Sequence, residues 1–202
     1  LDRGDGYRNI SEQNVPFDEF NQVNAFFILG SELNMDNANV SYLVQQEKFR
    51  RNIPMQLITD KEESAMKHKA DSSLHVDSYY YFVKAANHYL LSAGLQNDLY
   101  LNDRSEGYDE YRKQLLKNNY HDLLRQAGVE ASEVESFVNQ FNREANSVLL
   151  FSEKEVNGNA AREIRNLCLL TGKLGKTAAG IVALKEKNNS QGLIDMGIHP
   201  ET

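Results

Sequence analysis

The stretch Ala25–Gly30 has the sequence AFFILG, an unbroken apolar run that stops at a glycine. A strand covered on both faces of a parallel sheet is apolar throughout, whereas a strand with one wet face alternates. We therefore predict a fully buried strand over Ala25–Leu29. Apolar residues at helical spacing then predict a helix over Asn37–Arg51, and a second apolar run after Pro54 predicts a strand over Met55–Thr59. Strand, helix and strand in this order form a parallel crossover unit.

The same alternation continues along the rest of the chain, while the polar segment Ser31–Asn37 is expected to be a loop. Ser132 and Glu135 match a capping box at the start of one helix. Three further strands are predicted at Leu74–Val76, Ser147–Phe151 and Ile181–Leu184. Further helices are expected after Asp77 or Ser78, at Tyr108–Lys117, at Tyr120–Ala127, after Ser132, and after Asn157 or Asn159.

This order of elements predicts an α/β fold, a Rossmann-like doubly wound and mainly parallel sheet flanked by helices. Residues 17–202 are expected to form this α/β domain, and residues 1–16 a loosely held lead-in segment. Because the first residue is Leu1 rather than methionine, we expect a piece cut from a longer chain.

Composition excludes several classes of protein. The 202 residues carry 22 Lys and Arg against 29 Asp and Glu, a net charge of 22 − 29 = −7. A general nucleic-acid binder needs a basic face for phosphates, so no nucleic-acid partner is expected. Cys168 is the single cysteine, which excludes a disulfide framework and a thiolate zinc site. No apolar run is long enough to span a bilayer, so we expect no direct membrane insertion and a cytoplasmic location.

Polar residues follow three of the predicted strands, at Gly30–Glu32, Asp60–Lys61 and Ser152–Glu153. In doubly wound sheets, ligands bind beyond the carboxyl ends of the strands. Gly30 permits close backbone approach, and a carboxylate such as Asp60 suits a ribose or a guanine edge. The turns lack a GxGxxG or P-loop pattern, and ordinary strand-to-helix turns have the same composition. Both interpretations stay open at this point.

The remaining reactive side chains do not indicate a metal-binding or catalytic arrangement. None of the five histidines pairs with another at i,i+4, so no protein-only metal site and no catalytic residue is assigned. Cys168 lies on the apolar side of its helix and is expected to be a buried small hydrophobe rather than a nucleophile. The segment Lys185–Gly192 is dense in amides and lysines after the last strand, which suits either a solvated loop or the binding of a polyanion with a heterocyclic base.

Two motifs near the end of the chain resemble a known family. Leu169–Gly180 has the sequence LLTGKLGKTAAG, and Lys187–Gly197 has the sequence KNNSQGLIDMG. They resemble the LTGNxGKPGAG and RGxNNxQGxxDMG motifs of the molybdopterin oxidoreductase superfamily. Leu57–Lys61, Ala70–Val76 and Arg104–Tyr111 resemble other motifs of that family, in the same order. The resemblance is greatest to formate dehydrogenase large subunits and to the molybdopterin-like large iron–sulfur subunit of NADH dehydrogenase.

The resemblance implies a role in binding a bis(molybdopterin guanine dinucleotide) cofactor with molybdenum or tungsten. It places cofactor-binding positions at Gly30, Ser31, Asp60, Lys61, Lys185, Asn188, Asn189, Gln191 and Gly192. It implies that the metal-ligating cysteine or selenocysteine and an iron–sulfur domain lie upstream, and that a further cofactor domain lies downstream. Those domains, and possible electron-transfer subunits, are the expected partners. The parent protein is expected to be an oxidoreductase, and the 202-residue chain alone to hold no cofactor and to be inactive.

The chain also departs from the family pattern. Glu32 stands where the family has asparagine, and two charges of one sign at 4 Å repel by about 4 kcal/mol at an effective dielectric near 20. Lys185 replaces an arginine and loses the bidentate fork that arginine offers to phosphate. Two functions therefore remain: a cofactor-binding domain of a molybdenum or tungsten oxidoreductase, or a cofactor-free scaffold domain of an NADH dehydrogenase-type iron–sulfur subunit.

Overall fold

The computed structural model describes residues 7, 10–30, 32–185 and 196. Its centre is a five-stranded sheet in the order β3-β2-β1-β4-β5, and every neighbouring pair is parallel. The strands are β1 (Ala25–Leu29), β2 (Met55–Thr59), β3 (Ser72–His75), β4 (Ser147–Ser152) and β5 (Gly180–Leu184). This order and these directions confirm the predicted α/β, doubly wound fold.

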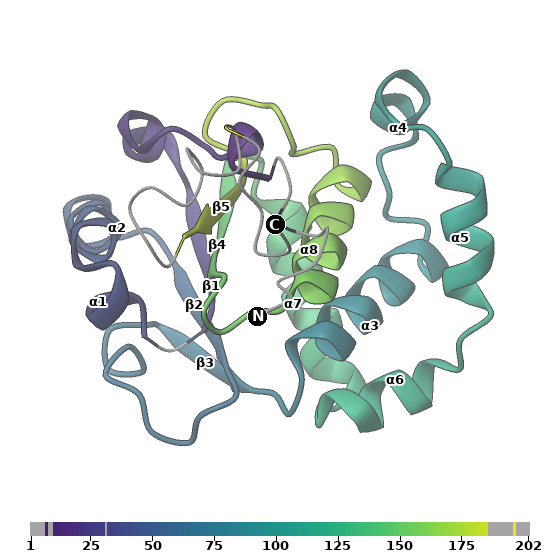
Figure 1. Ribbon diagram of the computed structural model, residues 1–202, viewed down its shortest axis with the longest axis horizontal. Coiled ribbons are helices and arrows are strands. Elements are labelled where there is room, and N and C mark those ends of the chain that lie inside the picture. Colours follow the sequence, from purple (N-terminus) through teal and green to yellow (C-terminus); the bar gives the residue numbers. More distant parts are fainter. Residues whose placement is uncertain (1–6, 8–9, 31, 186–195, 197–202) are drawn as a thin grey trace.

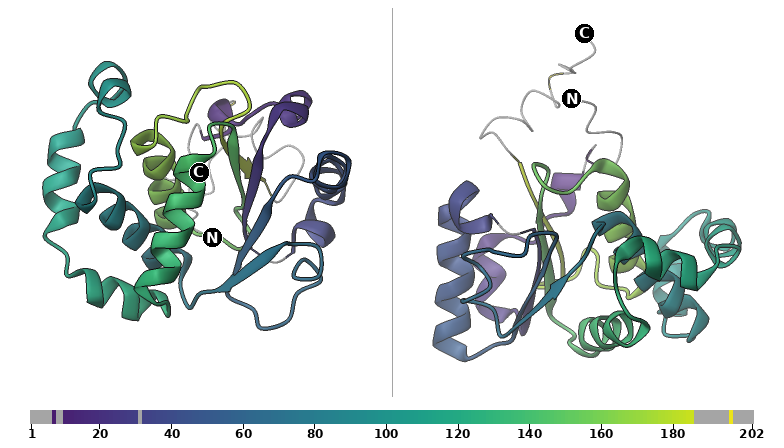
Figure 2. Two further views of the ribbon diagram at one scale, coloured as in Figure 1. Left: turned by 180° about the vertical axis from the view of Figure 1, so that it is seen from behind. Right: turned by 90° about the horizontal axis from the view of Figure 1, so that it is seen from below.

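Helices cover both faces of the sheet (Figures 1 and 2). One face carries the 3₁₀ helix η3 (Phe17–Gln22), the short α1 (Leu33–Asp36) and α2 (Ala38–Arg51). The other face carries α3 (Tyr79–Ser92), α7 (Ala131–Arg143) and α8 (Gly158–Leu170), with α4 (Asp98–Arg104), α5 (Tyr108–Leu116) and α6 (Tyr120–Ala127) lying outside them. None of the described helices is both long and apolar enough to cross a membrane.

The sheet divides the apolar interior into two cores. Phe27 packs edge-to-face on Phe137 and Phe141, with ring centroids 5.6 Å and 5.2 Å away, in the core shared with α3, α7 and α8. The next residue, Ile28, faces the smaller core with Val44 of α2. Alternate residues of β1 thus enter opposite cores, which explains why the strand is apolar throughout.

The start of the described chain packs more firmly than the sequence indicates. Tyr7 and Ile10 are buried in the larger core, and the 3₁₀ helix η2 (Ile10–Gln13) precedes a parallel bridge between Asn14 and Ile181. The amide side chain of Asn14 donates to the Ala183 carbonyl at 3.2 Å and accepts from its N–H at 2.8 Å. These bonds satisfy both backbone groups of Ala183 at the open edge of β5, where no further strand of the described residues pairs.

Three local predictions need correction. The segment expected to be a loop before α2 contains α1, and α4 was not expected. The Glu133 carboxylate accepts the backbone N–H of Glu130 at 2.9 Å, so the capping box of α7 lies two residues before the predicted Ser132–Glu135 pair. Glutamate at an N-cap is unusual, which is why the serine looked like the better candidate.

Candidate functional site

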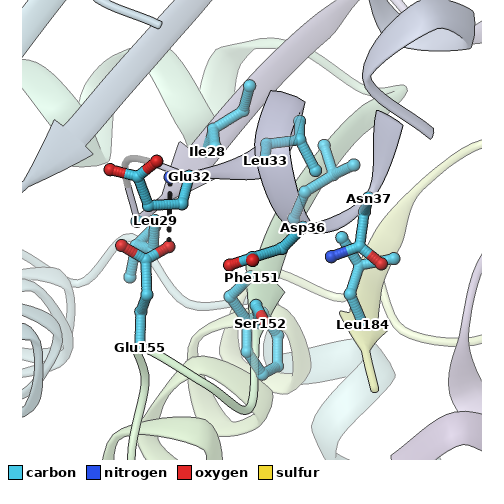
Figure 3. Close-up of a pocket in the computed structure, with 12 residues that line it drawn as sticks. Ile28, Leu29, Glu32, Leu33, Asp36, Asn37, Phe151, Ser152, Glu155 and Leu184 are labelled. Atoms are coloured by element: carbon cyan, nitrogen blue, oxygen red, sulfur yellow. Dashed lines mark hydrogen bonds between the residues drawn. The ribbon is translucent and has the colours of Figure 1, made fainter. Parts of the chain in front are cut away.

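The strongest candidate site lies at the carboxyl edge of the sheet, between β1 and β4. From β1 the chain proceeds outward through β2 to β3, and then crosses to β4 and β5 on the other side. The reversal opens a crevice where doubly wound folds bind ligands. A pocket lies at this point, as Figure 3 shows. Its lining comes from Ile28–Gly30, from Glu32, Leu33, Asp36 and Asn37, from Leu150–Ser152, and from Glu155 and Leu184.

Gly30 ends β1 in a conformation that few other residues adopt. Its φ is +112°, and its N–H donates to the Ile58 carbonyl at 2.9 Å, so the turn is fixed to the neighbouring strand. A Cβ built on Gly30 would lie 2.4 Å from Oε2 of Glu155. Glycine is therefore required here for both backbone and space, and a carboxylate fills that space.

Glu155 reaches this position from the turn after β4, 125 residues away in the sequence. Its Oε2 accepts the backbone N–H of Glu32 at 3.3 Å, the dashed line in Figure 3. Its Oε1 lies 3.7 Å from Nζ of Lys61, which also donates to Oε1 of Glu32 at 2.9 Å. The hydrogen bond that Lys61 donates to Glu32, together with the nearby carboxylates, raises the pKa of Lys61. Lys61 thus pairs with the carboxylates of both Glu32 and Glu155.

Asp60 is held at the end of β2 by Tyr79 of α3. The tyrosine hydroxyl donates to Oδ1 of Asp60 at 2.8 Å and accepts the Asp60 N–H at 3.1 Å. Burial, together with the adjacent Asp60 carboxylate, raises the pKa of Tyr79 far above its usual value, so the hydroxyl stays a donor. Asp60 itself is exposed, and its fixed carboxylate can accept hydrogen bonds from a ligand.

Lys185 follows β5 at the same edge but points elsewhere. Its Nζ lies 3.9 Å from Oε2 of Glu153, 3.4 Å from the Tyr7 carbonyl oxygen and 5.3 Å from the centre of the Tyr7 ring. Its side chain is only 12% exposed, so this lysine is held within the fold. Five other expected site residues lie outside the described residues: Ser31, Asn188, Asn189, Gln191 and Gly192.

The described residues fit one part of a guanine dinucleotide and oppose another. Asp60 offers a positioned acceptor of the kind that a guanine edge requires. Around Gly30, however, the pocket carries the carboxylates of Glu32, Asp36 and Glu155. Lys61 and Lys154 neutralise part of that charge, and Lys154 lies 2.6 Å from Asp36. A diphosphate does not fit beside Gly30 while Glu155 occupies the space.

The opposite, amino edge of the sheet holds a buried cation. Lys173, just after α8, is 4% exposed, donates to the Glu144 carbonyl at 2.5 Å and lies 5.1 Å from the centre of the Phe141 ring. Burial lowers its pKa to about 8. Cys168, fully buried in α8, lies in the larger core as a small hydrophobe, and the same cause raises its pKa to about 12. Within the described residues no cluster of His, Cys, Asp or Glu has a metal-binding arrangement.

Sequence reasoning found the turns after β1 and β2 but missed Glu155 and Tyr79. Glu155 lies three residues beyond the end of β4, where spacing alone does not predict the direction of a side chain. The sequence pattern indicates Tyr79 only as one of the apolar residues of its helix. The one available signal was the acidic pair Glu153 and Glu155 following a buried strand, at an edge where parallel strands end together.

Comparison with known proteins gives three informative sequence relatives. Formate dehydrogenase H of Escherichia coli K12 is 28% identical over 124 residues, 59% of this chain and 17% of that protein. The F420-dependent formate dehydrogenase 2 subunit alpha of Methanococcus maripaludis is 24% identical over 115 residues, 55% of this chain and 17% of that protein. The assimilatory nitrate reductase catalytic subunit of Bacillus subtilis is 25% identical over 112 residues, 54% of this chain and 16% of that protein. The chain thus matches less than a fifth of the length of these relatives.

The structural comparison agrees at the level of the fold. Acetylene hydratase from Pelobacter acetylenicus superposes with a TM-score of 0.60 and 11% sequence identity, over 79% of this chain and 22% of that one. No family model matches the sequence. These sequence relatives include formate dehydrogenases, which the motifs near the end of the chain resemble, and also a nitrate reductase. The chain is therefore related to the molybdopterin oxidoreductase superfamily.

Proposed function

We propose that the chain is the domain of a molybdenum- or tungsten-dependent oxidoreductase that holds the guanine dinucleotide part of a molybdopterin cofactor. The observation that carries this proposal is the position of Gly30 and Asp60. Each directly follows a strand at the carboxyl edge of the sheet, and Gly30 lines the pocket at the strand-order reversal. The chain is also similar in sequence to formate dehydrogenases. Doubly wound sheets bind nucleotides at that place.

The residues have separable roles in this proposal. Gly30 gives the turn after β1 its positive φ, beside a space that the Glu155 carboxylate fills in this structure. Asp60, fixed by Tyr79, accepts N–H groups of the guanine edge. Lys61 supplies a cation at the same turn. Lys185 and the amides of Asn188, Asn189 and Gln191 stay predicted contacts. When bound, the cofactor supplies the metal centre for redox chemistry.

The metal ligand is proposed to lie outside this chain. Cys168 is the only cysteine, and its thiol is fully buried in α8 with a raised pKa, so it is not available as a thiolate ligand. The chain would then orient the nucleotide end of the cofactor, while neighbouring domains of the same protein hold the metal and the iron–sulfur clusters. An action on formate, as the names of two of the sequence relatives indicate for those proteins, is part of the proposal.

The scaffold alternative of the NADH dehydrogenase type is less favoured, because the named relatives are formate dehydrogenases and a nitrate reductase. The deciding experiment is elemental analysis of the natural protein that contains this chain. We expect molybdenum or tungsten near one equivalent, and the release of guanosine monophosphate on acid hydrolysis. A protein that contains iron but neither of those metals would support the scaffold.

Variants then locate the site. Asp60→Ala removes the positioned acceptor and should lower the metal and nucleotide content at least fivefold. Glu62→Ala, two residues further on and exposed, is the matched control and should leave both unchanged. Equal metal content in the two variants would contradict the assignment of Asp60.

A further inference from the structure

We propose that Glu155 is a built-in competitor for the anion position beside Gly30, and that its carboxylate must swing out before a diphosphate can bind there. This inference rests on the proposed function, because it concerns the same edge of the sheet. It assigns to Glu155 a role in selecting the ligand, beyond any role in the fold.

The first argument is steric. Gly30 directly follows β1, and as a glycine it has no side chain to block the end of that strand. The space where its Cβ would be built is occupied by Oε2 of Glu155 at 2.4 Å, and the carboxyl carbon lies at 3.1 Å. A phosphate group and this carboxylate cannot share that volume.

The second argument is chemical. The contacts of Glu155 include a backbone N–H, that of Glu32, and an ammonium group, that of Lys61. Those are the two kinds of donor that proteins use for phosphate. The side chain is 11% exposed, so the carboxylate is well enclosed at this position. The carboxylate therefore imitates the anion that the turn is expected to receive.

The third argument is that Glu155 can leave without unfolding the turn. The backbone is held independently, because the N–H groups of Glu155 and Val156 both donate to the Ser152 carbonyl, at 3.2 Å and 2.9 Å. Rotation of the side chain alone would free the space beside Gly30. Lys61 would remain, since its shorter contact, 2.9 Å, is to Glu32.

The test uses the 202-residue chain and inorganic pyrophosphate as the probe, by isothermal titration calorimetry at constant ionic strength. We expect weak binding by the wild-type chain and at least tenfold tighter binding by Glu155→Ala. Glu155→Gln keeps the volume and removes the charge, so it should lie between them. Glu62→Ala removes a carboxylate from the same edge away from Gly30, and should behave as wild type. The double variant Glu155→Ala with Lys61→Ala should lose the gain.

Thermal unfolding gives an independent readout. Pyrophosphate should raise the Tm of Glu155→Ala by several degrees, and that of the wild-type chain no more than sodium chloride of equal ionic strength does. If Glu155→Ala does not fold, Glu155→Gln takes its place in both measurements. Equal pyrophosphate affinity in wild type and the Glu155 variants, or a gain that survives loss of Lys61, would overturn the inference. That failure is distinct from failure of the proposed function, which is decided by the metal and nucleotide content of the natural protein.

Discussion

The two edges of the sheet handle charge in opposite ways. At the carboxyl edge, Lys61 is 46% exposed and lies within 4 Å of two carboxylates. At the amino edge, Lys173 is almost completely buried and its ammonium faces a carbonyl oxygen and an aromatic ring. Exposed pairs are screened by water and contribute little, whereas a buried cation carries a desolvation cost. The carboxyl edge can therefore change its charges with little effect on the fold, as a ligand site requires, while at the amino edge charge and stability are coupled.

The largest expected effect tests the amino edge. Burial lowers the pKa of Lys173 in the folded state to about 8, against the 10.5 that is ordinary for a lysine. The unfolded chain therefore binds one more proton between those pH values, so this residue makes the protein more stable as pH rises through that window. Relative to Lys173→Met, wild type should gain about 3 kcal/mol of unfolding free energy between pH 7 and pH 10.5, at about 1.4 kcal/mol per pKa unit. Urea denaturation at the two pH values measures it, and a constant difference would show that the lysine is not desolvated.

A second substitution tests the geometry of the carboxyl edge. Gly30→Ala places a Cβ against Glu155 at a φ of +112°, and should cost about 2 kcal/mol of stability, from backbone strain plus the displaced carboxylate. Gly94→Ala is the matched control, because Gly94 also has a positive φ, +68°, with nothing within 4 Å of its Cβ. The excess cost at Gly30 should shrink when Glu155→Ala is added. Equal costs at the two glycines would mean that Glu155 does not fill the space.

A third substitution tests the hydrogen bonds between Tyr79 of α3 and Asp60 at the carboxyl edge. Tyr79→Phe removes the hydroxyl that donates to Asp60 and accepts its N–H, and should cost about 1.5 kcal/mol, as for hydrogen bonds to charged groups. Tyr42→Phe, at a tyrosine that is 65% exposed, should be neutral in chemical denaturation. A neutral Tyr79→Phe would show that Asp60 is not held in place by the tyrosine.

The smallest effect is expected for the exposed pair itself. Lys61→Met should change the unfolding free energy by less than about 1 kcal/mol, and the change should fall further in 0.5 M salt, because exposed ion pairs are screened. A salt-independent loss of 2 kcal/mol or more would place Lys61 in the same class as Lys173 and remove the contrast between the edges.

Much of the fold could be predicted because the strands of a parallel sheet are apolar on both faces. The runs at Ala25–Leu29 and Met55–Thr59 match β1 and β2 residue for residue. The prediction is weakest where burial is partial: the edge strand β3 buries only Leu74 and begins two residues before the predicted start. The short α4, with one buried residue, Leu101, gives too little periodicity to detect.

The site could be predicted only as far as the strand ends. Gly30 and Asp60 stand directly after apolar runs, so their place at the carboxyl edge follows from the parallel topology. The contact of Glu155 with Gly30 depends on how two turns approach each other in space, and the direction of a side chain in a turn has no periodic signature. The same holds for Lys185, whose contact with Tyr7 joins opposite ends of the described chain.

The contact between Lys185 and Tyr7 joins two segments that are far apart in the sequence. The Tyr7 ring packs against Phe151 with its centroid 6.0 Å away, its hydroxyl donates to the Val156 carbonyl at 2.7 Å, and Lys185 lies over the same ring. The segment around Tyr7, which precedes the sheet, and Lys185, which follows its last strand in sequence, therefore lie side by side. A circularly permuted gene, opened at the exposed turn around Gly94 and rejoined by a short linker from Lys185 to Tyr7, should encode the same five-stranded arrangement.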